Sequence, residues 1–346
     1  MNTTDTILVT GAGGFIGGHL VSSLLQKGFT RVRAADWKDV NSWYQFFPEA
    51  TNYERDLRLR DHCYEVLDGV DYVFNLAADM GGMGFIETHK ADCMLSVLIN
   101  THMLMAARDL GVKRFLFTSS ACVYAAEKQT EAEVMPLKES DAYPAQPEDG
   151  YGWEKLFSER MCRHFSEDFG LKTRAVRYHN VYGPHGTYDG GREKAPAAIC
   201  RKVIEAKLSG RHEIEIWGDG EQTRSFMYID DCVKGTLMLM GSDFSEPLNL
   251  GSDQLVTINQ LVDIAEDIAG IKLRRSYKLD APKGVRGRNS DNTLIKQELG
   301  WAPGIRLEDG LERTYRWIYD EITSRQAGVR QDERVASTPE AVRVAG

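Results

Sequence analysis

The segment GAGGFIGG, residues 11–18, constrains the fold of this chain more than any other stretch. It directly follows the apolar run TILVT and opens into the amphipathic segment FIGGHLVSSLLQKG. Gly11, Gly14 and Gly17 have the spacing GxxGxxG, and glycine at these positions permits a tight turn and close packing of a helix on a strand. The free N–H groups at the start of that helix favour an anion. The pattern predicts a strand, a turn and a helix that bind the diphosphate of a dinucleotide.

The first half of the chain alternates short β-branched runs with longer amphipathic segments. Strands are expected at residues 6–10, 31–36, 70–78, 113–120 and 173–178, and helices at residues 15–28 and 97–111. This alternation is typical of a parallel sheet with helices on both faces. The sequence therefore predicts an α/β protein whose residues 1–185 form a doubly wound parallel sheet of the Rossmann type.

The pattern changes after about residue 185. Strand-like and helical segments are mixed there, at residues 214–218, 225–229, 258–270 and 307–325. We expect a smaller mixed α/β lobe over residues 186–325, discontinuous because some of its segments return to the first domain. Residues 326–346 are polar and aperiodic, which indicates a mobile tail.

Charge and composition exclude several classes of protein. The net charge of −9 argues against nucleic acid as a partner, because that affinity needs a basic face. No apolar run approaches the ~18 residues that span a bilayer, and no signal peptide is visible, so we expect a cytoplasmic protein without membrane contact. The six cysteines form no CxxC pair and no metal-ligand cluster, and each is by default a buried thiol.

Two acidic residues follow expected strands near the glycine turn. Asp36 ends the second strand, where a carboxylate meets the ribose hydroxyls of adenosine and repels a 2′-phosphate. This favours NAD over NADP as cofactor. Asp56 either accepts a hydrogen bond from the adenine amino group or is a solvated turn residue. The other expected cofactor contacts are Phe15, Ile16 and Ala77.

The segment YGWEK places Tyr151 and Lys155 four residues apart, on one face of a helix. A phenol with a pKa near ~10 is a poor base at neutral pH. A neighbouring ammonium and a positive nicotinamide ring both favour the phenolate. Ser120, at the end of an expected strand, is a second hydroxyl contact for a reacting alcohol. These residues predict hydride transfer between an alcohol and NAD.

The motifs GxxGxxG, Asp36, NLAA, SSA, YxxxK and TRSFMYIDD together resemble the extended short-chain dehydrogenase/reductase family, whose members act on nucleotide sugars. The longer motifs AADMGGMGF, SSACVY, KESDAYPAQPEDGYGWEK, RYHNVYGPHGTYDGGREKAPAAICRK and PKGVRGRNSDN resemble the branch that epimerises GDP-mannose at C3 and C5. The resemblance covers nearly the whole chain. It implies an NAD-dependent isomerase with GDP-mannose as substrate, and a homodimer formed through helices at residues 97–108 and 151–164.

The resemblance also implies roles for single residues. The tyrosine and lysine of YxxxK serve hydride transfer, while the cysteine of SSAC and the lysine of GGREKA form an acid–base pair, which implies Cys122 and Lys194. The sugar and phosphate contacts that it implies are Gly81, Ser120, Ala121, Cys122, Asn180, Glu193, Lys194, Ala195, Lys202, Gln222, Thr223, Arg224, Arg286 and Arg288. Arg288 is favoured for phosphate, with Arg286 in support. A serine contact near the C-terminus has Ser337 and Thr338 as candidates.

The proposed acid–base pair has a chemical rationale. A C–H beside a sugar hydroxyl is not acidic, but a ketone at C4 acidifies the protons at C3 and C5. Inversion then needs one group on each face of the ring. A thiol, with a reference pKa near ~8.5, exchanges protons near neutrality, whereas a lysine at ~10.4 needs burial or nearby positive charge. The plain alternatives are a core thiol at Cys122 and a surface lysine at Lys194.

Other functions remain open on the sequence alone. A nucleotide-sugar C4-epimerase needs Tyr151 but gives no use to Cys122 and Lys194. A 4,6-dehydratase is disfavoured because Ala121 and Cys122 stand where a carboxylic acid pair is required. A protein that senses NAD without turnover is a further alternative, although YxxxK and the sugar motifs are intact.

Overall fold

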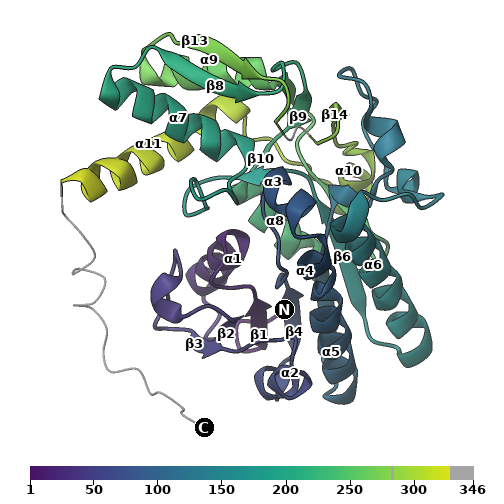
Figure 1. Ribbon diagram of the computed structural model, residues 1–346. Coiled ribbons are helices and arrows are strands. Elements are labelled where there is room, and N and C mark those ends of the chain that lie inside the picture. The colour runs from purple at the N-terminus through teal and green to yellow at the C-terminus, as the bar shows by residue number, and fades with distance from the viewer. Residues whose placement is uncertain (282–283, 328–346) are drawn as a thin grey trace.

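The computed structural model describes residues 1–281 and 284–327. Its centre is a seven-stranded sheet in the order β11-β6-β5-β4-β1-β2-β3, and every pair of neighbouring strands is parallel (Figure 1). The strands are β1 (Thr6–Thr10), β2 (Arg31–Asp36), β3 (Thr51–Glu54), β4 (Tyr72–Asn75), β5 (Arg114–Ser120), β6 (Thr173–Tyr178) and β11 (Leu248–Leu250). The order reverses between β1 and β4, which is where such sheets bind ligands at their carboxyl ends.

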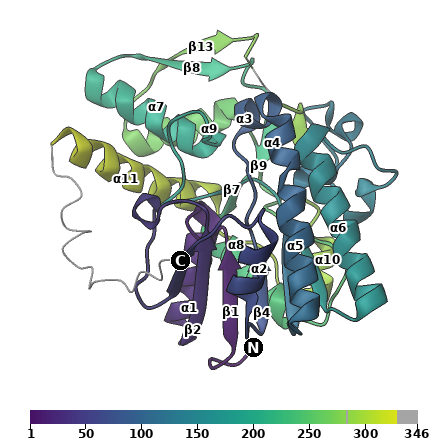
Figure 2. The same ribbon diagram turned by 60° about the horizontal axis from the view of Figure 1, so that its bottom comes forward.

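Helices cover both faces of this sheet, as Figures 1 and 2 show. Alternation along β1 explains why, since Ile7 and Val9 belong to the apolar core on one face and Leu8 to the core on the other. One face carries α1 (Phe15–Gln26) and α8 (Ile229–Gly241), and the other carries α2 (Arg60–Leu67), α5 (Ser96–Asp109) and α6 (Asp149–Phe169). The predicted doubly wound α/β fold is confirmed.

Strand β4 is shorter than the expected 70–78, since it ends at Asn75. The backbone N–H groups of Leu76 and Ala77 both donate to Thr10 Oγ1 at 3.0 Å instead of to a neighbouring strand. This side-chain acceptor turns the chain out of the sheet above the glycine turn. The expected strand at 225–229 is also divided, because β9 ends at Ser225 and α8 begins at Ile229.

The remaining described elements form the second lobe (Figure 1). Three small sheets pair β7 (Val181–Tyr182) with β10 (Met227–Tyr228), β9 (Thr223–Ser225) with β12 (Leu255–Thr257) and β14 (Gly287–Arg288), and β8 (Glu213–Trp217) with β13 (Arg274–Lys278). The helices are α7 (Ala195–Ser209), α9 (Ile258–Ala269), α10 (Thr293–Leu299) and α11 (Leu307–Gln326). Strand β11 follows α8 and adds to the edge of the main sheet, so the chain passes between the lobes more than once.

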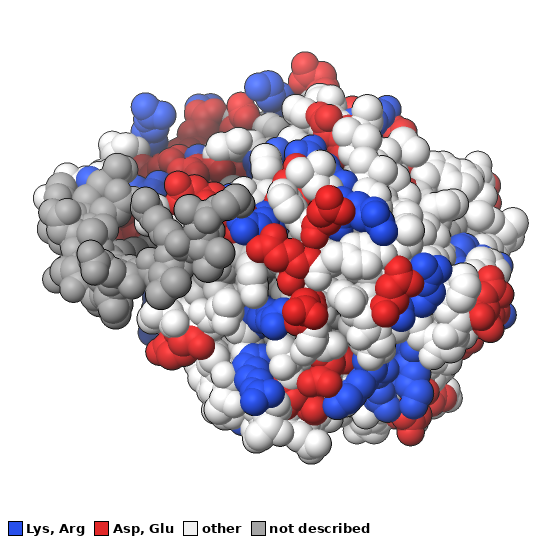
Figure 3. All heavy atoms as spheres, turned by 90° about the horizontal axis from the view of Figure 1, so that it is seen from below, with Lys and Arg blue, Asp and Glu red and all other residues white. Residues whose placement is uncertain are grey.

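Short helical segments complete the connections. They are α3 (Met83–Thr88), α4 (Lys90–Met94) and the 3-10 helices η1 (Val40–Ser42), η2 (Ala121–Val123), η3 (Ala126–Gln129) and η4 (Glu139–Ala142). All six cysteines are buried and unpaired. Within the described ranges, no helix has the length and apolar character that a membrane crossing requires. Basic and acidic side chains lie side by side over the visible part of one face in Figure 3.

Two sequence expectations fall largely or wholly outside the described residues. They are the tail at 326–346 and the serine contact at Ser337 or Thr338.

Candidate active site

The glycine turn closes tightly between β1 and α1. Gly11 has a φ of +67°, in the left-handed region that glycine adopts without strain. A Cβ placed on Gly17 would lie 2.2 Å from the carbonyl oxygen of Gly11, so only glycine allows the helix to approach the turn this closely. The start of α1 is therefore presented at the carboxyl end of β1, where its N–H groups face the switch point of the sheet.

The two predicted acidic residues occupy this region in different ways. Asp36 is buried, and its carboxylate accepts the N–H of Gly13 at 3.0 Å and that of Lys38 at 3.1 Å, which fixes it beside the turn. Asp56 instead forms an ion pair with Arg58 at 2.6 Å. Its hydrogen bonds with Arg58 lower the pKa of Asp56, so the carboxylate stays charged.

A cavity of about 360 Å³ runs from this turn toward α6. It brings together a large part of the predicted site, and its lining includes Gly11, Gly14, Phe15, Ile16, Gly17, Asp36, Asp56, Ala77, Gly81, Ser120, Tyr151, Lys155 and Lys194. These residues come from the ends of five strands, from two helices and from the loop before α7. Their convergence on one concave surface identifies this cavity as the candidate active site.

Tyr151 and Lys155 lie on the first turns of α6, and both side chains are buried. The Lys155 ammonium lies 5.5 Å from the centre of the Tyr151 ring. Burial raises the pKa of Tyr151 well above its ordinary value, Cys122 and Glu154 add to the increase, and a hydrogen bond with Ser120 opposes it. Burial is the largest effect, so the lowering of this pKa that was expected from Lys155 is not found; Lys155 itself forms an ion pair with Glu154 at 3.5 Å.

Cys122 lies in η2, one turn beyond the end of β5. Its backbone N–H donates to Ser120 Oγ at 3.2 Å, and its side chain packs in a small apolar cluster with Tyr151, Phe85 and Cys93. The residue does not line the main cavity but borders a second one beside it. Cys122 is thus a neighbour of Tyr151, and its exposed fraction is 7 %.

Lys194 is the residue before α7 and lines the main cavity. Burial lowers the pKa of its ammonium, and Cys122 acts in the opposite direction. Lys194 is half-buried, and this partial burial is the condition that a lysine base requires. Cys122 does not line the main cavity, but it packs in one cluster with Tyr151, which lines the same cavity as Lys194.

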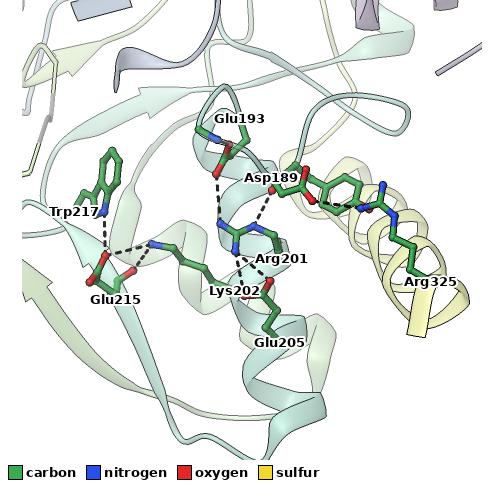
Figure 4. Close-up of polar contacts among 10 residues, drawn as sticks. Asp189, Glu193, Arg201, Lys202, Glu205, Glu215, Trp217 and Arg325 are labelled. Carbon is green, nitrogen blue, oxygen red and sulfur yellow. Dashed lines mark hydrogen bonds and ion pairs between the residues drawn. The ribbon is translucent and has the colours of Figure 1, made fainter. Parts of the chain in front are cut away.

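Arg201 stabilises the loop that carries Lys194 through polar contacts (Figure 4). Arg201 Nε donates to the carbonyl of Tyr188 at 2.8 Å, and its guanidinium pairs with Glu193 at 3.4 Å. Glu193 in turn accepts the N–H of Gly191 at 2.7 Å. Glu193 was expected to contact substrate. In this structure, its carboxylate instead stabilises the loop to which it belongs.

The three predicted arginines have distinct surroundings. Burial lowers the pKa of Arg224 to about 10, with Cys122 opposing it, and its guanidinium donates to the carbonyls of Thr223 and Val285. Arg286 pairs with Asp219 at 2.8 Å. Arg288 is 5 % exposed and contacts three side chains: Gln129 at 2.7 Å, Cys122 Sγ at 3.8 Å, and Glu148 through an ion pair.

Other predicted substrate contacts lie outside the main cavity. Lys202 points toward β8, where its ammonium donates to the carbonyl of Glu215 at 2.9 Å (Figure 4). Asn180 donates to the carbonyl of Ser225 at 3.1 Å. Gln222 donates to the carbonyl of Trp217 at 2.8 Å, while its buried Oε1 lacks a partner. The remaining ones are Ala121 in η2, Ala195 at the start of α7 and Thr223 in β9.

Several cavity residues were not expected from the sequence. Trp37 and Arg58 line the cavity beside Asp36, with the guanidinium 5.8 Å from the ring of the tryptophan. Arg192 lines it from the Lys194 loop and pairs with Asp79 at 2.9 Å. Because Trp37 directly follows Asp36, the sequence could have predicted that Trp37 lines the cavity. Nothing in the sequence pairs Arg192 with Asp79.

The residues present fit a dinucleotide cofactor. Gly17 leaves space that any side chain would fill, the start of α1 offers N–H groups for a diphosphate, and Asp36 stands at the end of β2. Tyr151 and Lys155 lie farther along the same cavity. The fold and the site define a Rossmann-type protein with a dinucleotide-binding cavity beside a second lobe.

Residues 7–251 match the model of the NAD dependent epimerase/dehydratase family, and the chain belongs to that family. The expected resemblance is confirmed by curated relatives. GDP-mannose 3,5-epimerase 1 of Oryza sativa subsp. japonica is 50% identical over 317 residues, which is 91% of this chain and 82% of the relative. GDP-mannose 3,5-epimerase of Arabidopsis thaliana is 48% identical over 322 residues, 93% of this chain and 84% of the relative.

Solved structures give the same picture. UDP-glucose 4-epimerase from Thermotoga maritima, solved with UDP-glucose, has a TM-score of 0.82 and 28% identity, covering 92% of this chain and 99% of its own. UDP-glucuronic acid 4-epimerase from Bacillus cereus, solved with UDP-glucuronic acid and NAD, has a TM-score of 0.78 and 25% identity, covering 91% and 99%. Membership of this family and the NAD of that complex support NAD binding by this chain.

Proposed function

We propose that this protein is an NAD-dependent isomerase that epimerises GDP-D-mannose at C3 and C5. The product would be GDP-L-galactose, with GDP-L-gulose formed when only C5 is inverted. The names of the relatives at about half identity support the substrate. The observation that carries the mechanism is that Lys194 lines one cavity with Tyr151 and Lys155, while Cys122 packs in one cluster with Tyr151.

The first step is oxidation at C4 of the hexose. NAD, when bound, supplies an acceptor for the hydrogen of C4 and later returns it. Tyr151 would receive the proton of the C4 hydroxyl as a phenolate, which the positive ring of bound NAD would favour against the effect of burial, and Ser120, which hydrogen-bonds with Tyr151, orients that hydroxyl. Lys155 holds the position of the cofactor's sugar. The C4 ketone then acidifies the C–H bonds at C3 and C5.

The second step is exchange of protons at those carbons. One of Cys122 and Lys194 removes a proton from one face of the ring, the enolate forms, and the other group delivers a proton from the opposite face. Burial lowers the pKa of Lys194, which raises the fraction of neutral amine available as a base near neutral pH. Reduction of C4 then completes the reaction without net redox change.

The diphosphate needs cationic donors in the second lobe. Arg224 and Arg286 supply guanidinium groups near β9, and Lys202 supplies an ammonium on α7. The sequence also assigns Arg288 to phosphate, although the donors of its guanidinium are engaged by Gln129, Glu148 and Cys122. We keep Arg224 as the main phosphate contact in the proposal.

We further propose a cytoplasmic homodimer. Large apolar side chains are exposed along the neighbouring helices α4, α5 and α6, and they are Met94, Leu95, Leu98, Trp153 and Phe157. An exposed group of this kind favours association of two chains through these helices. The six unpaired thiols are typical of a reducing compartment.

Incubation with GDP-α-D-mannose in D₂O tests the proposal. Deuterium is expected at both C3 and C5 of the recovered sugar, because each inversion exchanges a proton with solvent-equilibrated groups. Label at neither carbon would reject the mechanism, and epimerisation at C4 alone would favour a C4-epimerase. Tightly bound NAD without turnover of any nucleotide sugar would favour a sensor.

A Cys122→Ser variant tests the acid–base pair separately. It should retain NAD and hydrogen transfer at C4 while losing most inversion, because a hydroxyl does not exchange protons near neutral pH. Thermal unfolding is the control for folding. Full inversion in this variant would show that the thiol is a structural residue.

A further inference from the structure

Helix α6 carries a buried carboxylate that the proposed mechanism does not use. Glu154 stands directly before Lys155, and its side chain has 0% exposure. Its Oε1 accepts hydrogen bonds from Asn100 Nδ2 at 2.5 Å and from Ser158 Oγ at 2.8 Å. A buried carboxylate is strongly destabilising unless it is paired with a cation. The cation that pairs with Glu154 should therefore indicate the role of this carboxylate.

That partner is the lysine of the catalytic motif. Glu154 Oε2 has no hydrogen-bond partner but lies 3.5 Å from Lys155 Nζ. Within the described part of the chain, no other carboxylate lies within 4 Å of this ammonium. The other neighbours of the ammonium are the rings of Phe117 at 4.9 Å and Tyr151 at 5.5 Å. Lys155 lines the main cavity, so the pair stands at its wall.

The carboxylate is fixed by a chain of buried polar groups that leads back to the glycine turn. Asn75 Nδ2 donates to Asn100 Oδ1 at 2.7 Å, and Thr10 Oγ1 donates to Asn75 Oδ1 at 2.8 Å. Every member of the chain, from Thr10 to Glu154, is at most 2 % exposed. A buried network of this kind allows little movement of the Glu154 carboxylate, whose Oε1 it binds.

The groups that face Tyr151 come from several elements. Cys122 lies in η2, Cys93 in α4, and Glu154 and Lys155 in α6 itself, while Lys194 lines the same cavity. Among them, Glu154 raises the pKa of Tyr151, in the same direction as burial and the thiols. The Glu154 carboxylate thus opposes the lowering of the Tyr151 pKa that Lys155 alone would cause.

We propose that Glu154 is a positioning residue for Lys155. The Glu154 carboxylate holds the Lys155 ammonium at the cavity wall and cancels most of the charge of that ammonium, so that the site accepts the cationic ring of NAD⁺. An unpaired ammonium in the wall would repel that ring, whereas the paired ammonium leaves NAD⁺ and neutral NADH more nearly equal. This inference rests on the proposed function only in that it takes NAD as the cofactor. It concerns binding, and no sugar enters it.

The test compares the affinities of NAD⁺ and NADH for the full-length protein without any nucleotide sugar. Competition between the two, followed by NADH fluorescence, gives the ratio Kd(NAD⁺)/Kd(NADH) directly. Glu154→Gln keeps the side-chain shape and an acceptor for Asn100 and Ser158 but removes the charge. We expect the ratio to rise about tenfold, the size of one charge interaction at close range in a partly buried site.

Glu159→Gln is the matched control, because Glu159 is a buried carboxylate on the same helix that pairs with Arg177 at 2.7 Å. Its ratio should stay within about twofold of the wild type. A general loosening of α6 would weaken both cofactors equally in both variants and leave the ratio unchanged. A folded Glu154→Gln protein with the wild-type ratio overturns the proposal.

A double variant covers the case in which Glu154→Gln alone does not fold. Glu154→Gln with Lys155→Met removes both charges together, which should restore folding and return the ratio to within about threefold of the wild type. A double variant that does not fold, or that keeps the shifted ratio, shows that the carboxylate does not act through Lys155. Loss of turnover with GDP-mannose would instead bear on the proposed function, which this assay does not involve.

Discussion

Arg288 allows a direct test, because the sequence and the structure assign different roles to its guanidinium. The sequence resemblance implies a phosphate contact. In the structure, its donors are directed at Gln129, Glu148 and the sulfur of Cys122, with the last contact at 3.8 Å. A cation at the sulfur stabilises negative charge that develops there when the thiol gives up a proton. We therefore expect Arg288→Met to impair the proton exchange that depends on Cys122.

The size of the effect follows from the contacts. A hydrogen bond to a charged group contributes about 1.5–3 kcal/mol, which corresponds to about a 10- to 150-fold loss in the rate of inversion at C3 and C5, because each inversion uses Cys122. Hydrogen transfer at C4 should change little, and KM should stay within about threefold. A lost phosphate contact would instead raise KM by a similar factor at both carbons.

The assay is deuterium incorporation at C3 and C5, measured at saturating and at limiting GDP-mannose. Arg288→Met leaves Glu148 buried without its cation, so the variant is less stable, and Arg288→Met with Glu148→Gln is the control in which both charges are absent. An increase in KM alone, with unchanged exchange at saturation, would refute the reasoning and return Arg288 to the phosphate.

Three further predictions concern other parts of the molecule. Because burial lowers the pKa of Lys194 and a base must be neutral, the exchange that depends on it should increase as pH rises through that lowered pKa. Lys194→Arg, which stays charged, should abolish this exchange at every pH in the D₂O assay. Gly17→Ala places a Cβ 2.2 Å from a carbonyl oxygen and should weaken NAD binding more than about tenfold by fluorescence titration, with folding retained by circular dichroism. Glu159→Gln leaves Arg177 buried without its partner, and a loss of about 3–5 kcal/mol over a chain of this length should lower Tm by about 4–7 °C in calorimetry.

The parts of the fold that the sequence predicted best are those set by local chemistry. Strands β1, β2 and β6 have the expected bounds, because short β-branched runs between turn residues determine them. The glycine turn and Asp36 also lie where the spacing placed them. Strand β4 is shorter than expected because the hydroxyl of Thr10, sixty-six positions before Leu76, captures the N–H groups that would have extended it.

The surroundings of the predicted residues could not be read from the sequence. Arg288 meets Gln129 across 159 positions and Glu148 across 140, and no local pattern encodes such contacts. Glu154 was visible in the sequence as a helix residue, but its burial against Asn100 depends on how α5 packs on α6. Residue types and motifs thus predicted candidate reactive side chains, whereas the charge partners of those side chains required the three-dimensional structure.

The start of α6 connects the groups that we propose for hydride transfer with those that we propose for proton exchange. The N–H of Glu148, the residue before the helix, donates to the carbonyl of Cys122 at 2.9 Å, and its carboxylate binds Arg288 of the second lobe. A Cβ on Gly152 would lie 2.3 Å from that same carbonyl, so the helix touches the thiol's loop with no side chain between them. Tyr151, one residue earlier, is consequently held at a fixed distance from the sulfur. An opening of the second lobe that separates Arg288 from Glu148 should also disturb the loop of Cys122 and the first turn of α6, because Glu148 bonds to Arg288, to the carbonyl of Cys122 and to the N–H of Gly152.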